Sequence, residues 1–169
     1  AVNGVINIIT RNAASAQGTQ ISAAVGSELH GSLFASHGLA LSETTHLEVH
    51  AKSQYVEPSS TPEASSARDF WRTRQAGFRL DGKAGGDRFR VQGSVRDSVA
   101  GDHFMMPTPQ GRTPFLPVNP ANELAYLLGR WDHVADGGVT HSVQAYVEHS
   151  DMDIVIAREQ RTTFDIEYQ

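Results

Sequence analysis

The stretch VTHSVQAYVE, residues 139–148, largely alternates between apolar and polar residues. Its odd positions are mostly apolar and its even positions are polar. The two sets are, in order, Val139, His141, Val143, Ala145 and Val147, then Thr140, Ser142, Gln144, Tyr146 and Glu148. Successive side chains of a β-strand point to opposite faces of its sheet, so this period of two predicts a strand with one apolar and one polar face.

The same alternation recurs along most of the chain, whereas no stretch of the sequence shows sustained apolar residues at helical spacing. Together these patterns predict eight strands, at residues 19–26, 31–41, 45–57, 70–82, 86–98, 123–135, 138–150 and 160–169. Most of them run to about 10–13 residues, which is longer than the roughly 5–6 residues of typical strands in globular proteins. This length is close to the roughly 9–11 residues that a tilted strand needs to cross a bilayer.

The connections between the predicted strands alternate between short and long, apart from a short first loop at about residues 27–30. Tight turns are expected from the Gly, Asp and Ser residues at 42–45, 82–87 and 135–138, and longer loops at 57–69, 99–122 and 151–160. An up-and-down meander then has its short turns at one end and its long loops at the other, as transmembrane β-barrels do. The sequence therefore predicts an all-β, antiparallel, up-and-down transmembrane β-barrel.

Composition excludes several other classes of protein. The chain has 169 residues, no cysteine and a formal net charge of −5. Without cysteine there are no disulfides, thiolate metal ligands or cysteine nucleophiles. The negative charge argues against a general nucleic-acid binder, which needs a basic surface. With 39% hydrophobic residues the chain is not a disordered tail, and no apolar run reaches the roughly 18 residues of a membrane-spanning helix.

The sequence opens with AVNGVINIITRNA, an apolar run with a glycine inside it. This stretch resembles the end of the plug domain of TonB-dependent outer-membrane receptors, in which a G-V-I-N-I-I-T segment forms the last strand of the plug before the chain enters the barrel. The residues that carry the likeness are Ala1, Val2, Asn3, Gly4, Val5, Ile6, Asn7, Ile8, Ile9 and Thr10. The closing TTFDIEYQ, residues 162–169, resembles a recurrent barrel strand of the same family more weakly.

The resemblance implies two parts in this chain. Residues 1–14 would be the C-terminal end of the plug domain, and residues 15–169 would be the N-terminal part of the barrel. Plugged outer-membrane transporters close their barrels with 22 strands, so the chain would supply about eight strands of a larger, partial barrel. A signal peptide, a TonB-binding motif and most of the plug would lie upstream of residue 1.

The resemblance also implies a function and a location. Receptors of this family lie in the outer membrane of Gram-negative bacteria and take up scarce solutes by active transport coupled to TonB. The solute is commonly a ferric siderophore or another iron chelate, and in some members haem, cobalamin or a saccharide. The expected partners are TonB, through a segment missing upstream, outer-membrane lipid and lipopolysaccharide, and the small-molecule or metal-chelate substrate, but no nucleic acid.

Two other functions compete with this one. The first is a self-contained eight-stranded outer-membrane barrel that serves as an anchor or adhesin, which leaves the plug-like opening unexplained. The second is a soluble carbohydrate-binding β-sandwich, which should refold in plain buffer, whereas either kind of barrel requires detergent or lipid.

Catalytic and metal-binding motifs have little support in the sequence, which contains no nucleophile elbow, HExxH or phosphate-cradling glycine loop. His46 and His50 would be about 13 Å apart in a strand, too far to share an ion directly. His103, Met105 and Met106 form a ligand set suited to copper, but a small apolar cluster at a loop tip is the preferred interpretation. The sequence predicts no enzymatic activity, no metal site and no cofactor.

The basic residues are concentrated between Arg68 and Arg96, a stretch with eight of the 14 Lys and Arg residues and only three acidic ones. Within it, Arg88, Arg90 and Arg96 fall on the polar face of their strand, where pairing with plug carboxylates is preferred over ligand contact. Arg72 and Arg74 share the side of Ala76, Phe78 and Leu80 but lie nearer the long-loop end. There we expect them to contact lipopolysaccharide phosphates through charge-assisted pairs.

Aromatic and loop residues complete the set of candidates. Tyr55, Trp71 and Trp131 are candidates for the membrane interface. If the chain is a receptor, its long loops should contribute to capture of the ligand. The contact residues expected in the longest loop are Phe104, Met105, Arg112 and Phe115.

Overall fold

The computed structural model describes residues 11–27, 29–62, 65–105, 109, 111 and 115–169. Their secondary structure begins with one 3-10 helix, η1 (Ala13–Ala16), which is followed only by strands. The strands are β1 (Gly18–Ala24), β2 (Gly31–Ala40), β3 (Thr45–Val56), β4 (Trp71–Ala84), β5 (Asp87–Ala100), β6 (Asp102–Met105), β7 (Phe115–Val118), β8 (Ala121–Val134), β9 (Thr140–Asp153) and β10 (Arg158–Tyr168). None of the helical structure in these ranges has the length and hydropathy to cross a membrane.

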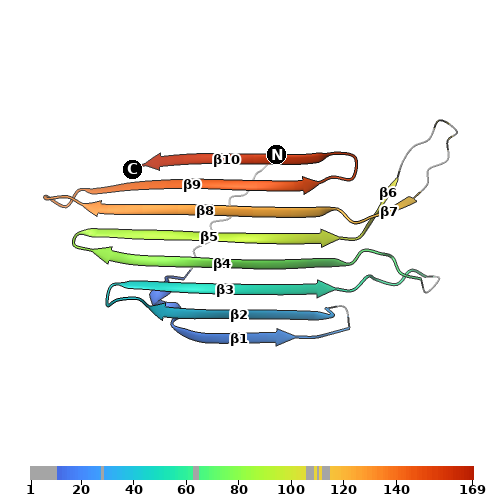
Figure 1. The fold of residues 1–169 in the computed structure, drawn as a ribbon, viewed down its shortest axis with the longest axis horizontal. Helices are drawn as coiled ribbons and strands as arrows, with labels where there is room; N and C mark the ends of the chain where they lie inside the picture. The colour runs from blue at the N-terminus through green and yellow to red at the C-terminus, as the bar shows by residue number, and fades with distance from the viewer. Residues whose placement is uncertain (1–10, 28, 63–64, 106–108, 110, 112–114) are drawn as a thin grey trace.

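Eight of the strands form one antiparallel sheet in the order β1-β2-β3-β4-β5-β8-β9-β10, and β6 and β7 pair separately as a two-stranded sheet. Neighbours in the large sheet are consecutive along the chain apart from the inserted β6 and β7, so it is an up-and-down meander (Figure 1). The predicted all-β class, antiparallel pairing and eight main strands are confirmed. Within the described residues the sheet does not close, because β1 and β10 are its two edges.

The two longest connections, β3–β4 and β5–β8, lie at the same end of the sheet, as the sequence predicts, but the β9–β10 connection at that end is only residues 154–157 (Figure 1). The turns β2–β3, β4–β5 and β8–β9 share one end, called here the turn end, and the remaining connections share the loop end. The β4–β5 turn consists of Gly85 and Gly86 alone. Gly85 has φ +61°, the positive value that a type II′ hairpin turn requires at its first central position.

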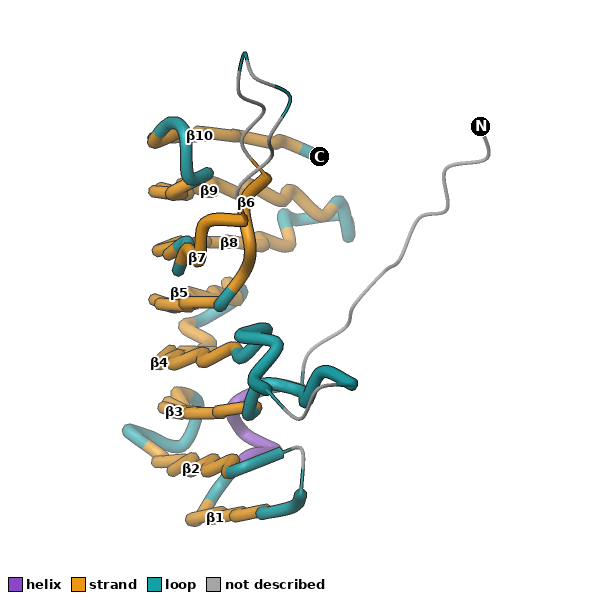
Figure 2. The backbone as a smooth tube through the Cα atoms, turned by 90° about the vertical axis from the view of Figure 1, so that its right-hand side faces the viewer, coloured by secondary structure: helices purple, strands orange, loops and turns teal. Residues whose placement is uncertain are grey.

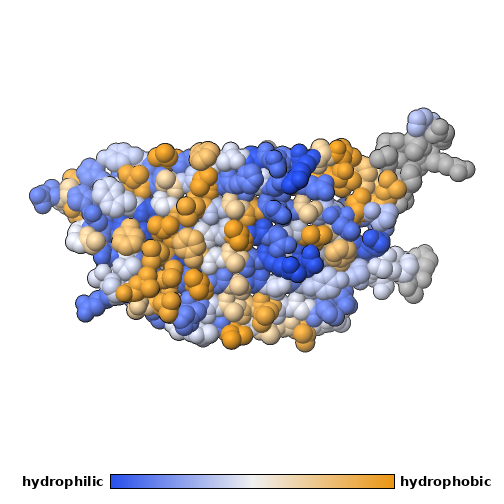
Figure 3. Space-filling model, viewed as in Figure 1, coloured by the Kyte–Doolittle hydropathy of each residue, from blue (hydrophilic) through white to orange (hydrophobic). Residues whose placement is uncertain are grey.

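The two faces of the large sheet differ in polarity. One face, called here the apolar face, carries Leu80 and Phe78 on β4, and the opposite face, the polar face, carries Arg79 and Asp81. Figure 3 views the sheet with the apolar face toward the reader: hydrophobic residues gather over its turn-end half, and a hydrophilic belt crosses the sheet nearer the loop end.

The described part of the sheet has almost no buried core of its own. Ala13 is the one buried apolar residue among the described residues, at 1% exposure, whereas Phe164 and Ile166 on β10 are 76% and 79% exposed. Soluble monomers rarely leave contiguous apolar surface of this kind uncovered. The apolar face therefore needs a covering that these residues do not provide.

The segment before β1 lies against the polar face (Figure 2). Asn12 caps η1 by accepting a hydrogen bond from the backbone N–H of Ala14 at 2.8 Å. The segment approaches β2 closely at Gly38, where an added Cβ would lie 2.0 Å from the carbonyl oxygen of Ala16. Only glycine allows this contact without displacement of one of the two backbones.

The predicted strand boundaries agree with the structure to within three residues, but one predicted loop contains additional structure. Residues 99–122 were expected to form a single long loop, and the structure places β6 and β7 inside it. Each strand is four residues long, and β7 contains Pro117, which supplies no backbone N–H. Such short, proline-containing segments do not show the sustained alternation from which the other strands were predicted.

Candidate functional site

The pairing register aligns the apolar face into rows that run across β4, β5, β8, β9 and β10. Three rows, apolar except for His149 and Thr162, occupy the middle: Leu80, Val91, Gly129, Ala145 and Ile166; Phe78, Gly93, Leu127, Val147 and Phe164; Ala76, Val95, Ala125, His149 and Thr162. The next row toward the turn end is Gly82, Phe89, Trp131, Val143 and Tyr168, and the next toward the loop end is Arg74, Asp97, Glu123, Asp151 and Gln160. We call these two the aromatic row and the charged row.

The spacing of the two bounding rows is the same on all five strands, because the register holds across the sheet. On β8, for example, Trp131 and Glu123 are eight residues apart. At about 3.3 Å per residue this is roughly 26 Å along the strand, or about 20 Å of height for a strand tilted by about 40°, as in transmembrane barrels. The apolar band of outer-membrane barrels is about 25 Å tall and is flanked by aromatic girdles, so the dimensions are comparable.

Histidines extend the aromatic row toward the turn end. The ring of His133 stacks on Trp131 with 5.6 Å between centroids and approaches Asp87 Oδ1 with Nδ1 at 2.5 Å. His141 stacks on Tyr168 in the same way, and its Nδ1 lies 2.7 Å from the tyrosine hydroxyl. These pairs make a polar edge on an aromatic girdle, which is the character of side chains at a membrane–water interface.

The three predicted interfacial aromatics do not all lie on one face. Trp131 is in the aromatic row, and Tyr55 lies on the apolar face at the loop end, 5.6 Å from the ring of His30. Trp71 pairs with Val56 and Ala100, which places it on the polar face. Trp71 thus lies on the opposite face of the sheet from Trp131 and Tyr55.

The charged row contains more carboxylates than the sequence reasoning anticipated. Glu123 is the direct cross-strand neighbour of both Asp97 and Asp151, and Arg74 is next to Asp97. Like charges in this position repel each other. Asp151 is neutralised by Arg158, whose Nε donates to Oδ1 at 2.6 Å and whose Nη2 contacts the second oxygen. At the other end of the row Arg74 offsets the charge of Asp97.

The two arginines predicted to meet lipopolysaccharide lie where the prediction places them, on the apolar face beyond its apolar rows. Arg74 is exposed, whereas Arg72 is half-buried between Tyr55 and Val99 of the neighbouring strands. The Nε of Arg72 is buried and has no hydrogen-bond partner among the described residues. Of the two, Arg74 is the side chain that an anionic group outside the sheet can reach directly.

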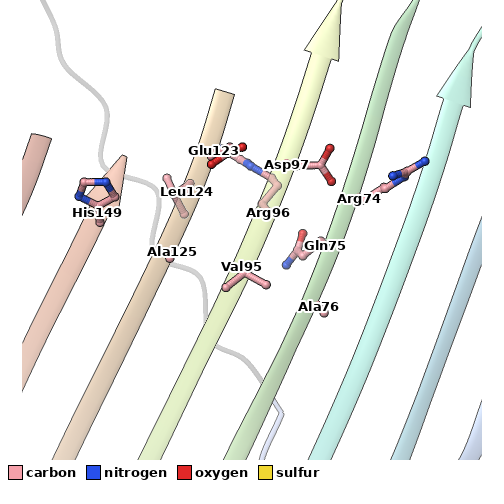
Figure 4. A pocket seen from close by; sticks show the side chains of 10 residues that line it. All are labelled: Arg74, Gln75, Ala76, Val95, Arg96, Asp97, Glu123, Leu124, Ala125 and His149. Carbon is pink, nitrogen blue, oxygen red and sulfur yellow. The ribbon is translucent and has the colours of Figure 1, made fainter. Parts of the chain in front are cut away.

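A shallow pocket of about 450 Å³ opens just inside the charged row (Figure 4). Ala76, Val95 and Ala125 lie side by side on β4, β5 and β8, while Arg74 and Glu123 stand two residues nearer the loop end. The small side chains leave a hollow in the apolar face below a charged rim.

The predicted ligand contacts in the longest loop are only partly described. Phe104 and Met105 belong to β6 and pair with Leu116 and Phe115 of β7, so the hairpin brings three of the four predicted residues together by their backbones. Phe104 is half-buried and Met105 is 55% exposed. Arg112 lies outside the described residues.

The loop between β3 and β4 is folded and attached to the start of β6. Asp69 accepts hydrogen bonds from the backbone N–H and the hydroxyl of Ser59 at 2.6 and 2.7 Å, and these bonds lower the pKa of Asp69 below its usual value. Gly101 donates to the carbonyl of Phe70 at 2.7 Å, and a Cβ at Gly101 would lie 1.9 Å from the carbonyl oxygen of Arg68. The two longest connections are therefore in contact at the loop end.

The third expected loop, residues 151–160, is shorter in the structure because β9 and β10 extend into it. Only residues 154–157 connect the two strands. Val155 has φ +71°, and Ile156 donates to the carbonyl of Ile154 at 2.8 Å, which is the hydrogen bond of a γ-turn. Ile156 is 72% exposed, so an apolar, strained tip projects at the loop end.

The most buried charges of the described residues lie on the polar face beneath η1. Arg79 donates from Nε to Asp81 Oδ2 at 2.6 Å and from Nη2 to Oδ1 at 3.1 Å, and Arg90 donates to Oδ1 at 3.2 Å. The backbone N–H of Ala13 donates to the same carboxylate at 2.9 Å. Arg79 and Asp81 are only 6% and 8% exposed. Sequence reasoning did not find this cluster, since Ala13 and Asp81 are 68 residues apart.

Other polar-face side chains form a network at lower burial. Arg130 donates to Asp132 at 3.0 Å, and the hydroxyl of Ser142 donates to the same carboxylate oxygen at 2.5 Å. The hydroxyl of Tyr146 donates to Glu148 at 2.6 Å. These hydrogen bonds hold side chains of the polar face in place, although that face is open to water.

The remaining sequence predictions concern metals and the opening segment. Within the described ranges, no group of three or more His, Cys, Asp or Glu side chains is placed to hold a metal ion. The plug-like motif, residues 3–10, lies outside the described residues. Family models, curated proteins and solved structures were compared with the chain, and none of them matches it.

Proposed function

We propose that the chain forms part of the wall of a transmembrane β-barrel, that of a TonB-dependent receptor in the outer membrane of a Gram-negative bacterium. The observation that carries the proposal is the apolar face of β4, β5 and β8–β10, where three rows lie between an aromatic and a charged row. Lipid is the covering that suits an apolar band with these borders. Lipid cannot form hydrogen bonds with the unpaired backbone groups at the edges of β1 and β10. Further strands of a larger barrel would therefore pair with these two edges.

The polar face then lines the lumen of the barrel. The segment 11–17 lies on this face and is attached to it by the bond from Ala13 to Asp81. Residues 11–17 would therefore lie on the luminal side of the wall. This is the side that a plug domain requires, and it agrees with the resemblance of residues 1–10 to the end of a plug.

The receptor function rests on that resemblance together with the loop end. The contacting connections 57–70 and 101–120 and the strained tip at Val155 would form the outer surface that captures a ferric siderophore or another iron chelate. Coupling to TonB would then move the plug and open a path along the polar face. The residues in this path bind and position a solute, and the protein is proposed to act as a transporter with no enzymatic step and no cofactor of its own.

The two competing functions fit the sheet less well. A self-contained eight-stranded barrel needs β1 to pair with β10, and the two strands are edges instead. A β-sandwich needs two packed sheets, whereas the eight main strands described here lie in a single sheet.

Growth under iron limitation tests the receptor function. A strain that lacks the protein should grow normally with abundant free iron and at a reduced rate when iron is supplied only as chelates. The protein itself should be recovered in the outer-membrane fraction of the parent strain. Unchanged growth on every iron chelate would remove iron uptake from the proposal, and recovery in the soluble fraction would remove the barrel.

Lipopolysaccharide should contact Arg72 and Arg74. Replacing both with glutamine is expected to lower the amount of lipopolysaccharide that co-purifies with the protein severalfold, because each guanidinium contributes charge-assisted bonds to phosphate. Arg161→Gln, on the polar face of β10, is the matched control and should leave the amount unchanged. Equal amounts in the double variant and the parent would contradict the contact.

A further inference from the structure

A pocket of about 550 Å³ lies on the polar face at the turn end, beside η1. One side is formed by Asn12 and Ala14 of the segment that crosses the face, and the floor carries Lys83 and Arg88 from the β4–β5 hairpin. The volume is within the roughly 300–1,000 Å³ of ordinary small-molecule sites.

Two pairs of like charges face this pocket. Lys83 is the direct cross-strand partner of Arg88, and Arg90 is the direct partner of Arg130. All four line the pocket. Positive charges directly opposite one another on neighbouring strands are destabilising, so the arrangement favours an anion that lies between them.

The carboxylates in the pocket do not neutralise all four cations. Asp81 is engaged by Arg79, Arg90 and the backbone of Ala13, and Asp132 is engaged by Arg130 and Ser142. Glu43 is the only other acid that lines the pocket within the described residues. The side chains of Lys83 and Arg88 make no hydrogen bond or ion pair with the described part of the chain.

The segment that borders the pocket does not supply the counter-charge either. Residues 11–17, which cross the polar face, contain no Asp or Glu, and neither do residues 1–10 before them. Arg88 is also the direct cross-strand partner of Asp132, and Glu43 lines the same pocket. Four cations thus face three carboxylates, one of which is shared with Arg79, so a bound anion would supply the missing negative charge.

We propose that this pocket binds a small anionic solute through carboxylate or phosphate groups, with Lys83 and Arg88 as the principal donors. Charge-assisted hydrogen bonds to both cations would hold the anion between them. The location of the pocket inside a transport lumen rests on the proposed function, and there it would be a site for anionic solute at the turn-end mouth. Binding itself follows from the pocket and its charges alone.

Calorimetric titration of the native protein, purified in detergent micelles, tests the site with two probes, succinate and inorganic phosphate. We expect saturable binding of at least one of them, and affinity at least tenfold weaker in the double variant Lys83→Gln, Arg88→Gln, because two charge-assisted donors are lost. Binding of only one probe would assign the site to carboxylates or to phosphates. Lys52→Gln is the matched control: Lys52 lies on the polar face of β3, outside the pocket, and should leave affinity unchanged.

The possible results of this titration test the anion site independently of the proposed receptor function. Absence of saturable binding by a folded sheet, checked by circular dichroism, would overturn the site and leave a carboxylate of another protein segment as the occupant. An equal loss of affinity in Lys52→Gln would overturn it as well, because the binding would then be a diffuse charge effect. Growth on iron chelates and recovery in the outer-membrane fraction are independent of this titration, so either proposal can fail alone.

Discussion

Replacing Asp81 with asparagine should lower the free energy of unfolding by about 3 kcal/mol, at the lower end of the range for breaking a buried ion pair. The carboxylate accepts from Arg79, Arg90 and the backbone of Ala13, and both Arg79 and Asp81 are almost fully buried. Asparagine keeps the shape of the side chain but removes its charge and one acceptor oxygen. The Arg79 guanidinium, which is almost fully buried, would then face a neutral amide.

Asp132→Asn is the matched control for this prediction. Asp132 also pairs with an arginine two residues away on the polar face, but the Asp132 and Arg130 side chains are 20% and 33% exposed. A more exposed pair contributes less, so its loss should be at most about 1 kcal/mol. Denaturant unfolding of the protein in detergent measures both values. Equal losses for the two variants would show that burial under η1 adds nothing to the Asp81 cluster.

A second measurement separates two roles of Asp81, namely holding the segment 11–17 against the polar face and stabilising the sheet. The amide of Ala13 donates to the Asp81 carboxylate and is buried. In Asp81→Asn its hydrogen exchange should become faster, while amides in the middle of β8 remain protected. Unchanged exchange at Ala13 would mean that contacts such as the close approach at Gly38 hold the segment without Asp81.

The strands could be predicted from the sequence because their signals are local. Alternation in a stretch such as 139–148 depends only on neighbouring residues, and a two-residue turn such as Gly85–Gly86 is marked by its own composition. Once short turns fix three hairpins, an antiparallel meander follows with few alternatives. This is why the all-β class, the antiparallel pairing and the common end of the three tight turns agree with the prediction, whereas the sheet of the described residues is not closed.

The sites depend on contacts that no local pattern records. Asp97, Glu123 and Asp151 come to lie in one row only through the register of β5, β8 and β9, so this row of carboxylates was not visible in the sequence. The bond between Ala13 and Asp81 spans 68 residues. An aspartate in a strand of alternating character looks like an ordinary polar-face residue until the segment that covers it is known.

Replacing Leu127 with arginine should strongly reduce insertion of the protein into lipid, whereas the same change at Leu128 should be tolerated. Leu127 is in the middle row of the apolar face, between Gly93 and Val147, and Leu128 is its neighbour on the polar face. If the apolar face meets the bilayer, an arginine at position 127 lies near the midplane. There it costs about 2–4 kcal/mol on a barrel exterior, whereas substitutions that face the lumen do not carry this cost.

The pair of variants distinguishes a membrane wall from a soluble sheet because only the face differs. The fraction of protein that folds into phospholipid vesicles should fall for Leu127→Arg by at least tenfold relative to Leu128→Arg. In a soluble protein the result would be reversed or absent, because Leu127 is 46% exposed and an arginine at an exposed position is readily solvated. Equal insertion of both variants would mean that the apolar face of β8 does not contact lipid. Another protein surface would then have to cover this face.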